Sequence, residues 1–349
     1  MKAVFIGGTR RGYLTLDALV KSGAEIAGVV SLQQDSHEVE RYETPIRRLA
    51  LANRIPHCET RSLTDRDRYV DLLTREMKPD VAIVVGCRML IAPEIYQAPP
   101  LGTLAVHDSL LPEYRGFAPL NWSILNGEDH TGVTLFHLTE SADAGDIVAQ
   151  RRVPIGPDDT APVVYERVCQ ATVDLVLDTY PQLAAGTAPR TPQAHHRATF
   201  ACSRTPIDGE IDWSAPTAVV YNRVRALTYP YPGAYTYYRG RPLTIWSASR
   251  VENSPSYVGR IPGRVVSVSK TTGGIDVLTG DGVLRVHDVQ FDGVRTRPAD
   301  VVTSVRAALG LQTTDLLARI QALEERIAAL SANLDRVNEQ QGVSIDAVV

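Results

Sequence analysis

The chain has 349 residues, of which 44% are hydrophobic and 22% charged, and its formal net charge is −4. A chain of this length normally divides into two domains, and this composition is typical of a soluble globular protein. The small negative charge excludes a general electrostatic attraction to nucleic acid or to an anionic membrane. The four cysteines form no C-x-x-C pair, which argues against a zinc site and a disulfide framework, so no metal is expected.

The first residues, MKAVFIGGT, contain one basic residue and a short apolar run. That run is too short for a signal peptide or a membrane span, and no other segment is predicted to span a membrane. We therefore expect a cytoplasmic protein.

Short β-branched runs alternate with helical stretches in the first part of the chain. Continuous apolar strands separated by helices are typical of a parallel sheet covered on both faces. Predicted strands cover 2–8, 25–31, 80–86, 102–107, 132–139 and 145–155, and predicted helices cover 12–23, 45–54, 64–77, 121–128 and 161–183. We expect an α/β domain over residues 1–185, with a doubly wound, mainly parallel, Rossmann-like sheet.

The composition and periodicity of the sequence change after residue 185. Residues 186–200 are rich in Pro, Gly and Ala without periodicity and are predicted to form a linker. Residues 201–311 contain runs that alternate apolar and polar residues between glycine turns, which indicates a small antiparallel β-barrel. Two domains and a tail are therefore expected.

The tail, residues 312–341, carries a heptad pattern. Apolar residues recur at steps of four and three, at Leu316, Ile320, Leu323, Ile327, Leu330, Leu334 and Val337. Ile at the a positions with Leu at d favours a parallel two-stranded coiled coil, in which Arg319 at g can meet Glu324 at e of a partner. We expect a homodimer formed by this helix, and a helix that packs on its own chain is the alternative.

Two features of the sequence resemble ligand-binding motifs but lack residues that such motifs require. Gly7, Gly8 and Gly12 follow the first strand, but the dinucleotide spacing G-x-G-x-x-G and the Lys-Ser/Thr of a phosphate loop are both absent. His195 and His196 lie in the predicted linker without acidic or thiol neighbours, and we interpret them as solvated.

One histidine and one carboxylate follow predicted strands, at positions where an active site is expected. Open α/β sheets place their sites outside the carboxyl ends of the strands, and His107 ends a predicted strand. Asp143 follows a second strand and is succeeded by Ala144 and Gly145, which are small enough to let a loop approach a ligand. A carboxylate that holds the tautomer of a histidine supports proton transfer.

The segment HDSLLPEYRGFAPLNWSILNGEDHTGVTLFHLTESADAGDIVAQRRVPI resembles the catalytic segment of formyltransferases that use 10-formyltetrahydrofolate. Their hallmark is Asn-x-His-x-Ser-Leu-Leu-Pro followed by Asp-x-Gly. The segment is most similar to the formyltransferases of UDP-4-amino-4-deoxyarabinose and other sugars, and more distantly to methionyl-tRNA formyltransferase. FACSRTPIDGEIDWSAPTAVVYNRVRALTYPYPGAY resembles the start of their carboxyl-terminal barrel, so the resemblance covers residues 1–311.

The resemblance implies transfer of a formyl group from 10-formyltetrahydrofolate, as co-substrate, to an amine. His107 would handle the amine proton, Asp143 would orient His107, and Ser109 belongs to the same catalytic motif. The residues implied to bind the folate are Gly86, Cys87, Arg88, Met89, Leu90, Ala142 and Gly145. Those implied to face the acceptor are Tyr114, Arg115 and Asn121.

The chain departs from the family pattern at two positions. The family asparagine is replaced by Ala105, and loss of one such oxyanion donor costs about 2.7–4 kcal/mol of transition-state stabilisation. Another donor could reach the site, the reaction could differ from ordinary formyl transfer, or the chain could have been altered to trap ligands. Asp108 replaces the usual glycine or proline, and we expect it to point away from His107 because strands alternate faces.

The acceptor is expected to be a small molecule. Binding of tRNA needs a basic surface, yet residues 31–44 hold four acids and one arginine, and residues 201–311 hold thirteen basic and nine acidic residues. A nucleotide-linked amino sugar is the leading acceptor. An amino-acid-derived amine such as a hydroxylated ornithine fits the same motifs, Met-tRNA is a minor alternative, and no nucleic-acid or membrane partner is expected.

A different class of function stays open. Because of Ala105, the chain could be a formyltransferase scaffold that only binds a folate or a sugar nucleotide. Retention of His107, Ser109 and Asp143 together argues against it, since a binding protein needs no group that transfers protons.

Overall fold

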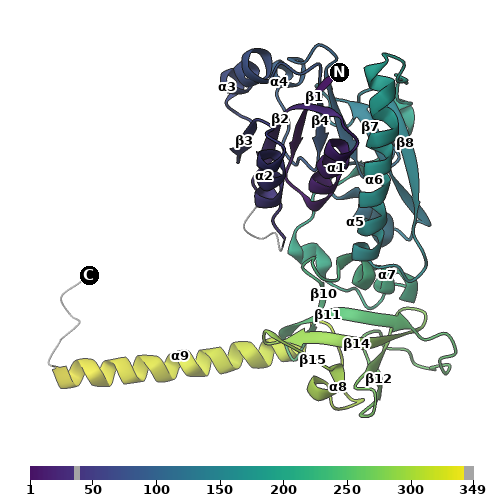
Figure 1. The fold of residues 1–349 in the computed structure, drawn as a ribbon. Coiled ribbons are helices and arrows are strands. Elements are labelled where there is room, and N and C mark those ends of the chain that lie inside the picture. The colour runs from purple at the N-terminus through teal and green to yellow at the C-terminus, as the bar shows by residue number, and fades with distance from the viewer. Residues whose placement is uncertain (35–39, 342–349) are drawn as a thin grey trace. The chain divides into compact units, whose positions relative to one another are not determined.

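A computed structural model describes residues 1–34 and 40–341, which divide into two units (Figure 1). Unit 1 comprises residues 1–208 and 225–232, and unit 2 comprises residues 209–224 and those from 233 onward. Part of the acidic loop noted above, residues 35–39, lies outside the described residues. No helix in the described ranges has an apolar stretch long enough to cross a bilayer.

A central sheet organises unit 1. Its strands are β1 (Lys2–Gly7), β2 (Glu25–Leu32), β3 (His57–Thr60), β4 (Val81–Val85), β5 (Thr103–His107), β7 (His130–His137) and β8 (Ile147–Pro154). Their order in this seven-stranded sheet is β3-β2-β1-β4-β5-β7-β8. The first five strands in that order are parallel, whereas β7 and β8 are antiparallel to their neighbours. The predicted mainly parallel α/β sheet is confirmed.

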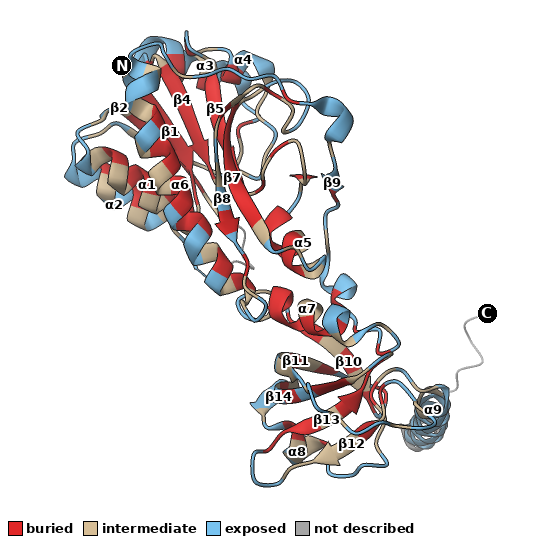
Figure 2. Ribbon diagram, turned by 90° about the vertical axis from the view of Figure 1, so that its right-hand side faces the viewer, coloured by how far each residue is buried: buried red, intermediate tan, exposed pale blue. Residues whose placement is uncertain are grey.

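Helices cover both faces of this sheet. They are α1 (Arg10–Lys21), α2 (Glu43–Ala52), α3 (Arg66–Asp71), the π-helical turn η1 (Leu72–Met77), α4 (Pro93–Tyr96), α5 (Pro119–Leu125) and α6 (Ala161–Ala184). Figure 2 shows α1, α2 and α6 together on one face. On the other face, side chains from α3, η1 and α4 pack against alternate residues of the sheet, among them Ile6, Val84 and Ala105. Burial of both faces explains why the strands read as unbroken apolar runs.

The segment expected to be a linker, residues 186–200, lies in unit 1. Thr191 pairs with Ile147, His195–Arg197 forms a short 3-10 turn, η2, and Gln193 is buried. Strand β9 (Phe200–Ala201) then pairs in parallel with β6 (Arg115–Gly116). Backbone pairing and a polar side chain hold this segment, and neither produces the apolar periodicity that sequence analysis detects.

Unit 2 is built on an antiparallel sheet. Its strands are β10 (Ala234–Tyr238), β11 (Arg241–Arg250), β12 (Val265–Val268), β13 (Ile275–Leu278), β14 (Val283–Phe291) and β15 (Val294–Thr296). The order is β10-β11-β14-β13-β12, with β15 also paired to β14. Within the described residues the edge strands β10 and β12 do not pair with each other, so closure is not confirmed. The remaining elements are the short turn η3 (Pro206–Gly209), which lies at the boundary of the two units, and the helices α7 (Thr217–Leu227) and α8 (Pro298–Val301).

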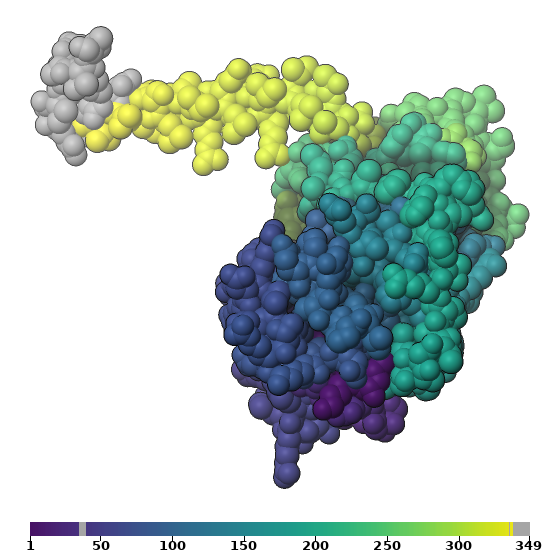
Figure 3. All heavy atoms as spheres, turned by 90° about the horizontal axis from the view of Figure 1, so that it is seen from above, coloured from purple at the N-terminus to yellow at the C-terminus, as the bar shows by residue number. Residues whose placement is uncertain are grey.

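The tail forms one helix, α9 (Thr313–Gln341). The residues at the heptad positions from Ile320 to Val337 are 45% to 63% exposed. In Figure 3 no other part of the chain covers the side of this helix that faces the viewer, drawn in yellow. Arg319 Nη1 donates to the carbonyl oxygen of Gly240, 2.9 Å away in unit 2. The predicted helix is therefore present, and a hydrogen bond near its start connects it to the loop between β10 and β11. The coiled coil is not confirmed.

Candidate active site

His107 lies at the carboxyl end of β5 and is 9% exposed. Its Nε2 atom is 2.7 Å from the carbonyl oxygen of Tyr114, and its Nδ1 atom is 3.7 Å from Asp143 Oδ2. A carbonyl oxygen only accepts hydrogen bonds, so Nε2 carries the hydrogen of the neutral ring. The lone pair of Nδ1 is therefore left to accept a proton, with the carboxylate nearby to stabilise the resulting charge.

Burial sets the protonation state of this histidine. Removal from water lowers the pKa of His107, while the charge of Asp143 and the hydrogen bond to Tyr114 oppose that shift and the charge of Arg11 adds to it. The net direction is downward. His107 is therefore neutral at neutral pH, which is the form a general base requires.

The loop between β7 and β8 holds Asp143 in an unusual backbone conformation, with φ at +53°. Its Oδ2 atom accepts a 2.8 Å hydrogen bond from the backbone N–H of Gly116. Gly145 approaches β7 so closely that an added Cβ would lie 1.8 Å from the carbonyl oxygen of His137. The small residues after Asp143 thus permit a tight loop that brings the carboxylate to His107.

Ser109 lies in the loop that follows His107 and is almost fully buried. Its hydroxyl donates to the carbonyl oxygen of Glu113 over 2.6 Å, and its own carbonyl accepts from Thr134 Oγ1 over 2.6 Å. These bonds shape the loop that carries Tyr114. The structure brings His107 and Asp143 together, but it places the Ser109 hydroxyl within the loop rather than against the imidazole.

Residues expected to face the acceptor have internal partners. The Tyr114 hydroxyl donates to Glu128, 2.6 Å away, and burial raises the pKa of Tyr114. Arg115 is 6% exposed and Asn121 3% exposed. Asn121 Nδ2 donates to the carbonyl oxygen of Ala226 over 2.8 Å. The side chains of Arg115 and Asn121 are therefore buried and hydrogen-bonded within unit 1, and their contact with an acceptor stays a prediction.

Asp108 pairs with Arg11, a residue of α1 that belongs to no motif of the sequence. Arg11 is 7% exposed on α1, and its Nη1 atom forms an ion pair with Asp108 Oδ1. Burial lowers the pKa of Arg11. Asp108 thus faces a buried cation that no local sequence pattern could have identified.

Ala105 packs among apolar side chains. It belongs to the buried cluster that includes Val84, Leu111 and Phe136, with Met89 packed against it. None of these side chains carries a donor that could replace the family asparagine.

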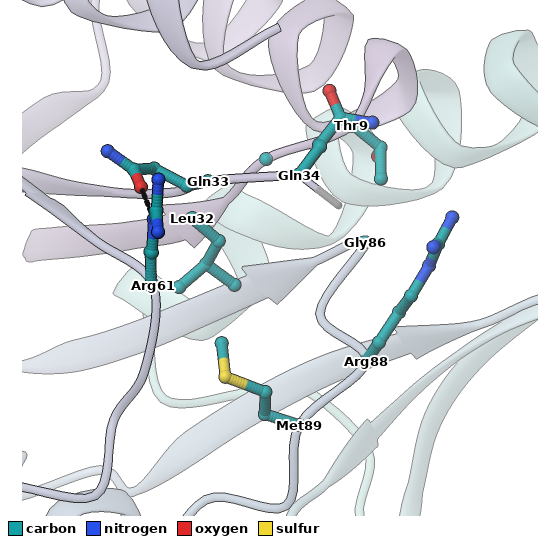
Figure 4. Close-up of a pocket in the computed structure, with 9 residues that line it drawn as sticks. Thr9, Leu32, Gln33, Gln34, Arg61, Gly86, Arg88 and Met89 are labelled. Carbon is teal, nitrogen blue, oxygen red and sulfur yellow. Dashed lines mark hydrogen bonds between the residues drawn. The ribbon is translucent and has the colours of Figure 1, made fainter. Parts of the chain in front are cut away.

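A pocket opens where β1, β2 and β4 end at their carboxyl edge. It encloses about 440 Å³, open solvent included, and is lined by Gly8, Thr9, Leu32, Gln33, Gln34, Arg61, Gly86, Arg88 and Met89. In Figure 4 the side chains of Leu32 and Met89 point toward each other, and Arg61 contacts Gln33. From β1 the chain adds strands β2 and β3 on one side and strands β4 and β5 on the other, so the direction of strand addition reverses between β1 and β4. Open α/β sheets bind ligands at such a switch point.

Five of the seven residues expected to bind folate lie in two places. Gly86, Arg88 and Met89 line the pocket, and Ala142 and Gly145 lie in the Asp143 loop. Leu90 is 85% exposed. The Cys87 thiol donates to the carbonyl of Met89, and burial raises the pKa of this thiol. Among the described residues, no group of three or more His, Cys, Asp or Glu side chains could hold a metal ion.

Solved structures share this fold. HypX from Aquifex aeolicus, solved with tetrahydrofolic acid, is 21% identical with a TM-score of 0.60; the alignment covers 87% of this chain and 47% of HypX, so the chain spans about half of that protein. WlaRD, a sugar 3N-formyl transferase solved with dTDP and 5-N-formyl-THF, is 17% identical over 84% of this chain and 98% of its own, with a TM-score of 0.62.

An N-formyltransferase from Helicobacter canadensis, in complex with folinic acid and dTDP-3-aminofucose, is 17% identical over 82% of this chain and 99% of its own, with a TM-score of 0.64. At these identities the likeness shows the fold alone. The sequence itself matches two family descriptions, Formyl transferase over residues 1–179 and Formyl transferase, C-terminal domain, over residues 204–305. The chain therefore belongs to the formyl transferase family.

Proposed function

We propose that the protein transfers a formyl group from 10-formyltetrahydrofolate to the amine of a small acceptor. The observation that carries this proposal is the approach of His107 Nδ1 to within 3.7 Å of Asp143 at the end of β5. Family membership supplies the reaction class. The adjacent strand, β4, leads directly into the pocket residues Gly86, Arg88 and Met89.

The pocket residues fit a folate by their chemistry. Leu32 and Met89 offer apolar surface to a flat ring, and the amide nitrogen of Gln34 offers a donor to its polar edge. Gly86 lets β4 turn close to Thr9 at the pocket wall, since an added Cβ would lie 2.1 Å from Thr9 Oγ1. When bound there, the folate would supply the activated formyl group.

His107 would move the proton in this reaction. A bond forms between the acceptor nitrogen and the formyl carbon, the bond from that carbon to N10 breaks, and Nδ1 of His107 accepts the proton that the amine loses. The carboxylate of Asp143 stabilises the imidazolium, which then returns the proton to N10. Proton transfer by a positioned side chain contributes about 10² to 10⁴ in rate.

A nucleotide-linked amino sugar is our leading acceptor. Support comes from the resemblance of the 107–155 segment to sugar formyltransferases and from the dTDP compounds in the WlaRD and Helicobacter canadensis structures. A hydroxyornithine-like amine or Met-tRNA would use the same proton-transfer pair. The apolar surroundings of Ala105 favour one second candidate, a protein that binds folate or sugar nucleotide without turnover.

Turnover distinguishes these functions. The protein is incubated with 10-formyltetrahydrofolate and a panel of amines: dTDP- and UDP-linked amino sugars, hydroxyornithine and Met-tRNA. Release of tetrahydrofolate together with a formyl mass gain on a sugar nucleotide is the expected result. Folate binding without transfer to any amine would support the binding protein instead, and transfer only to Met-tRNA would overturn the acceptor class.

We also propose that the protein is a homodimer through α9, and that it works in the cytosol. The exposed a and d side chains of α9 support the dimer, because an apolar seam at heptad spacing is stable when it meets a second helix. Four free cysteines, one of them exposed, suit a reducing compartment.

A further inference from the structure

Gln193 lies between the two family matches, which end at residue 179 and begin again at residue 204. It is nevertheless among the most buried polar residues of unit 1, with 5% of its surface exposed. A buried amide is costly unless its donors and its acceptor are all bonded, so its partners indicate what the position is for.

Both polar atoms of this amide have hydrogen-bond partners, the nitrogen on the Asp143 loop and the oxygen on β6. Nε2 donates to the carbonyl oxygen of Asp143 over 2.9 Å and to that of Gly145 over 2.7 Å. Oε1 accepts from Nε and Nη2 of Arg115, 3.2 and 2.5 Å away. The single side chain of Gln193 thus joins the loop that carries the carboxylate to the strand β6.

Strand β6 fixes the other end of Asp143. Arg115 is followed by Gly116, whose N–H donates to Asp143 Oδ2. The carboxylate is therefore held through Gly116 and the main chain through Gln193. An aspartate with a φ of +53° needs such external support, since this backbone region is unfavourable for residues with a side chain.

We propose that Gln193 and Arg115 are positioning residues, and that together they keep the carboxylate of Asp143 beside His107. This inference deepens the proposed function and rests on it. The predicted linker would then be part of the catalytic frame, and a segment outside both family matches would control the proton-transfer pair.

The charges around the pair are few, so the effect of the two residues on titration can be isolated. Asp143 and Arg11 face His107, Asp108 compensates Arg11, and Arg115 faces Asp143 with His195 Nδ1 3.0 Å from its Nη2 atom. Asp143 raises the pKa of His107. Displacement of the carboxylate should therefore move the titration of His107 to lower pH.

Two substitutions that leave the charge unchanged test the proposal. Gln193→Met keeps length and removes every hydrogen bond, and Arg115→Lys keeps the positive charge and loses the two-pronged contact. We expect kcat to fall about 100-fold in Gln193→Met, the cost of a displacement near 1 Å, with less change in the KM for folate. Arg115→Lys should show a smaller loss in the same direction.

Histidine NMR supplies a measurement that does not depend on turnover. In both variants His107 should titrate at lower pH than in the unmodified protein. Gln182→Met is the matched control, because Gln182 is exposed on α6 and its amide donates to the carbonyl oxygen of Asp178 on the same helix. The kcat and the His107 titration of this variant should not change.

The outcomes separate this inference from the proposed function. An unchanged kcat and an unchanged His107 titration in folded Gln193→Met and Arg115→Lys would overturn the positioning role. Equal losses in all three variants, control included, would also overturn it. If the unmodified protein formylates no amine, the proposed function fails, whereas a titration shift in the two variants alone would still show that they position Asp143.

Discussion

The two ring nitrogens of His107 have different partners, and this difference assigns their roles. Nε2 is occupied by the carbonyl oxygen of Tyr114, and Nδ1 faces Asp143 at 3.7 Å, longer than a hydrogen bond. A neutral ring leaves Nδ1 without a hydrogen, so this atom receives the proton. Catalytic contacts are often long without substrate and shorten in the reacting complex.

Ala105 is the position where a single amide should change the rate. Ala105→Asn restores the family donor, and if the site is a weakened formyltransferase the rate should rise by about 100-fold or more. The new amide would also lie among apolar side chains, so the melting temperature should fall. Tetrahydrofolate release and a thermal melt measure both effects. No gain in rate, with folate still bound, would contradict the weakened-enzyme interpretation.

Asp108 matters for stability through its buried partner. Asp108→Asn leaves Arg11 as an uncompensated cation that is 7% exposed, and breaking such a pair should lower the free energy of unfolding by about 3 kcal/mol. Denaturant unfolding measures the change. Glu94→Gln, which breaks an ion pair with Arg66 whose two side chains are more than half exposed, is the control and should have little effect. Equal effects would show that the buried pair is not special.

At the scale of elements, the periodic pattern of apolar residues was enough to predict the strands of the sheet. It was not enough to predict the contacts that complete the site. The strands predicted at 25–31, 80–86 and 102–107 correspond to β2, β4 and β5 within one or two residues. Their burial on both faces produces the signal directly. The closed barrel was not confirmed because alternation reports pairing within a sheet, and closure depends on which edges meet.

The missed site contacts join distant residues through polar side chains. Gln193 and Asp143 are 50 positions apart, and Asn121 and Ala226 are 105 apart. No spacing rule links such partners, so the burial of Asn121 and the role of Gln193 could not be predicted. His107 could be placed at the carboxyl end of β5 from the strand pattern. Asp143 was found through the family motif, because β7 runs antiparallel to β5 and ends at the other edge of the sheet.

The Asp143 loop should tolerate no side chain at Gly145. A methyl group there would lie 1.8 Å from the carbonyl oxygen of His137, so Gly145→Ala must shift the loop and move the carboxylate. We expect a loss in kcat of about 100-fold. Steady-state kinetics tests this, with Ser141→Ala, an exposed residue of the same loop, as control. Wild-type activity in Gly145→Ala would show that the position of Asp143 is not critical.

At the scale of the whole molecule, assembly and catalysis should separate. Ile320→Lys with Ile327→Lys charges two a positions of α9, and Ala322→Lys with Ala329→Lys places the same charges at c positions outside the seam. Light scattering should give a dimer for the unmodified chain and the c-position variant, and a monomer for the a-position variant. Turnover per chain should be the same in all three, because the proton-transfer pair lies in unit 1.

A single-chain mass for the unmodified protein at micromolar concentration would contradict the coiled coil. A dimer in the a-position variant would contradict it as well, since two lysines in a three-heptad seam leave too little apolar contact for association. Neither result would bear on formyl transfer.

The rate of tetrahydrofolate formation from 10-formyltetrahydrofolate and an accepted amine tests the central claim most directly. It should be measured side by side for the unmodified protein, His107→Gln and Asp143→Asn, with the exposed His196→Gln as control. The account predicts a loss of at least about 100-fold in the first two variants, with folate still bound, and none in the control. Wild-type rates in His107→Gln or Asp143→Asn would contradict it.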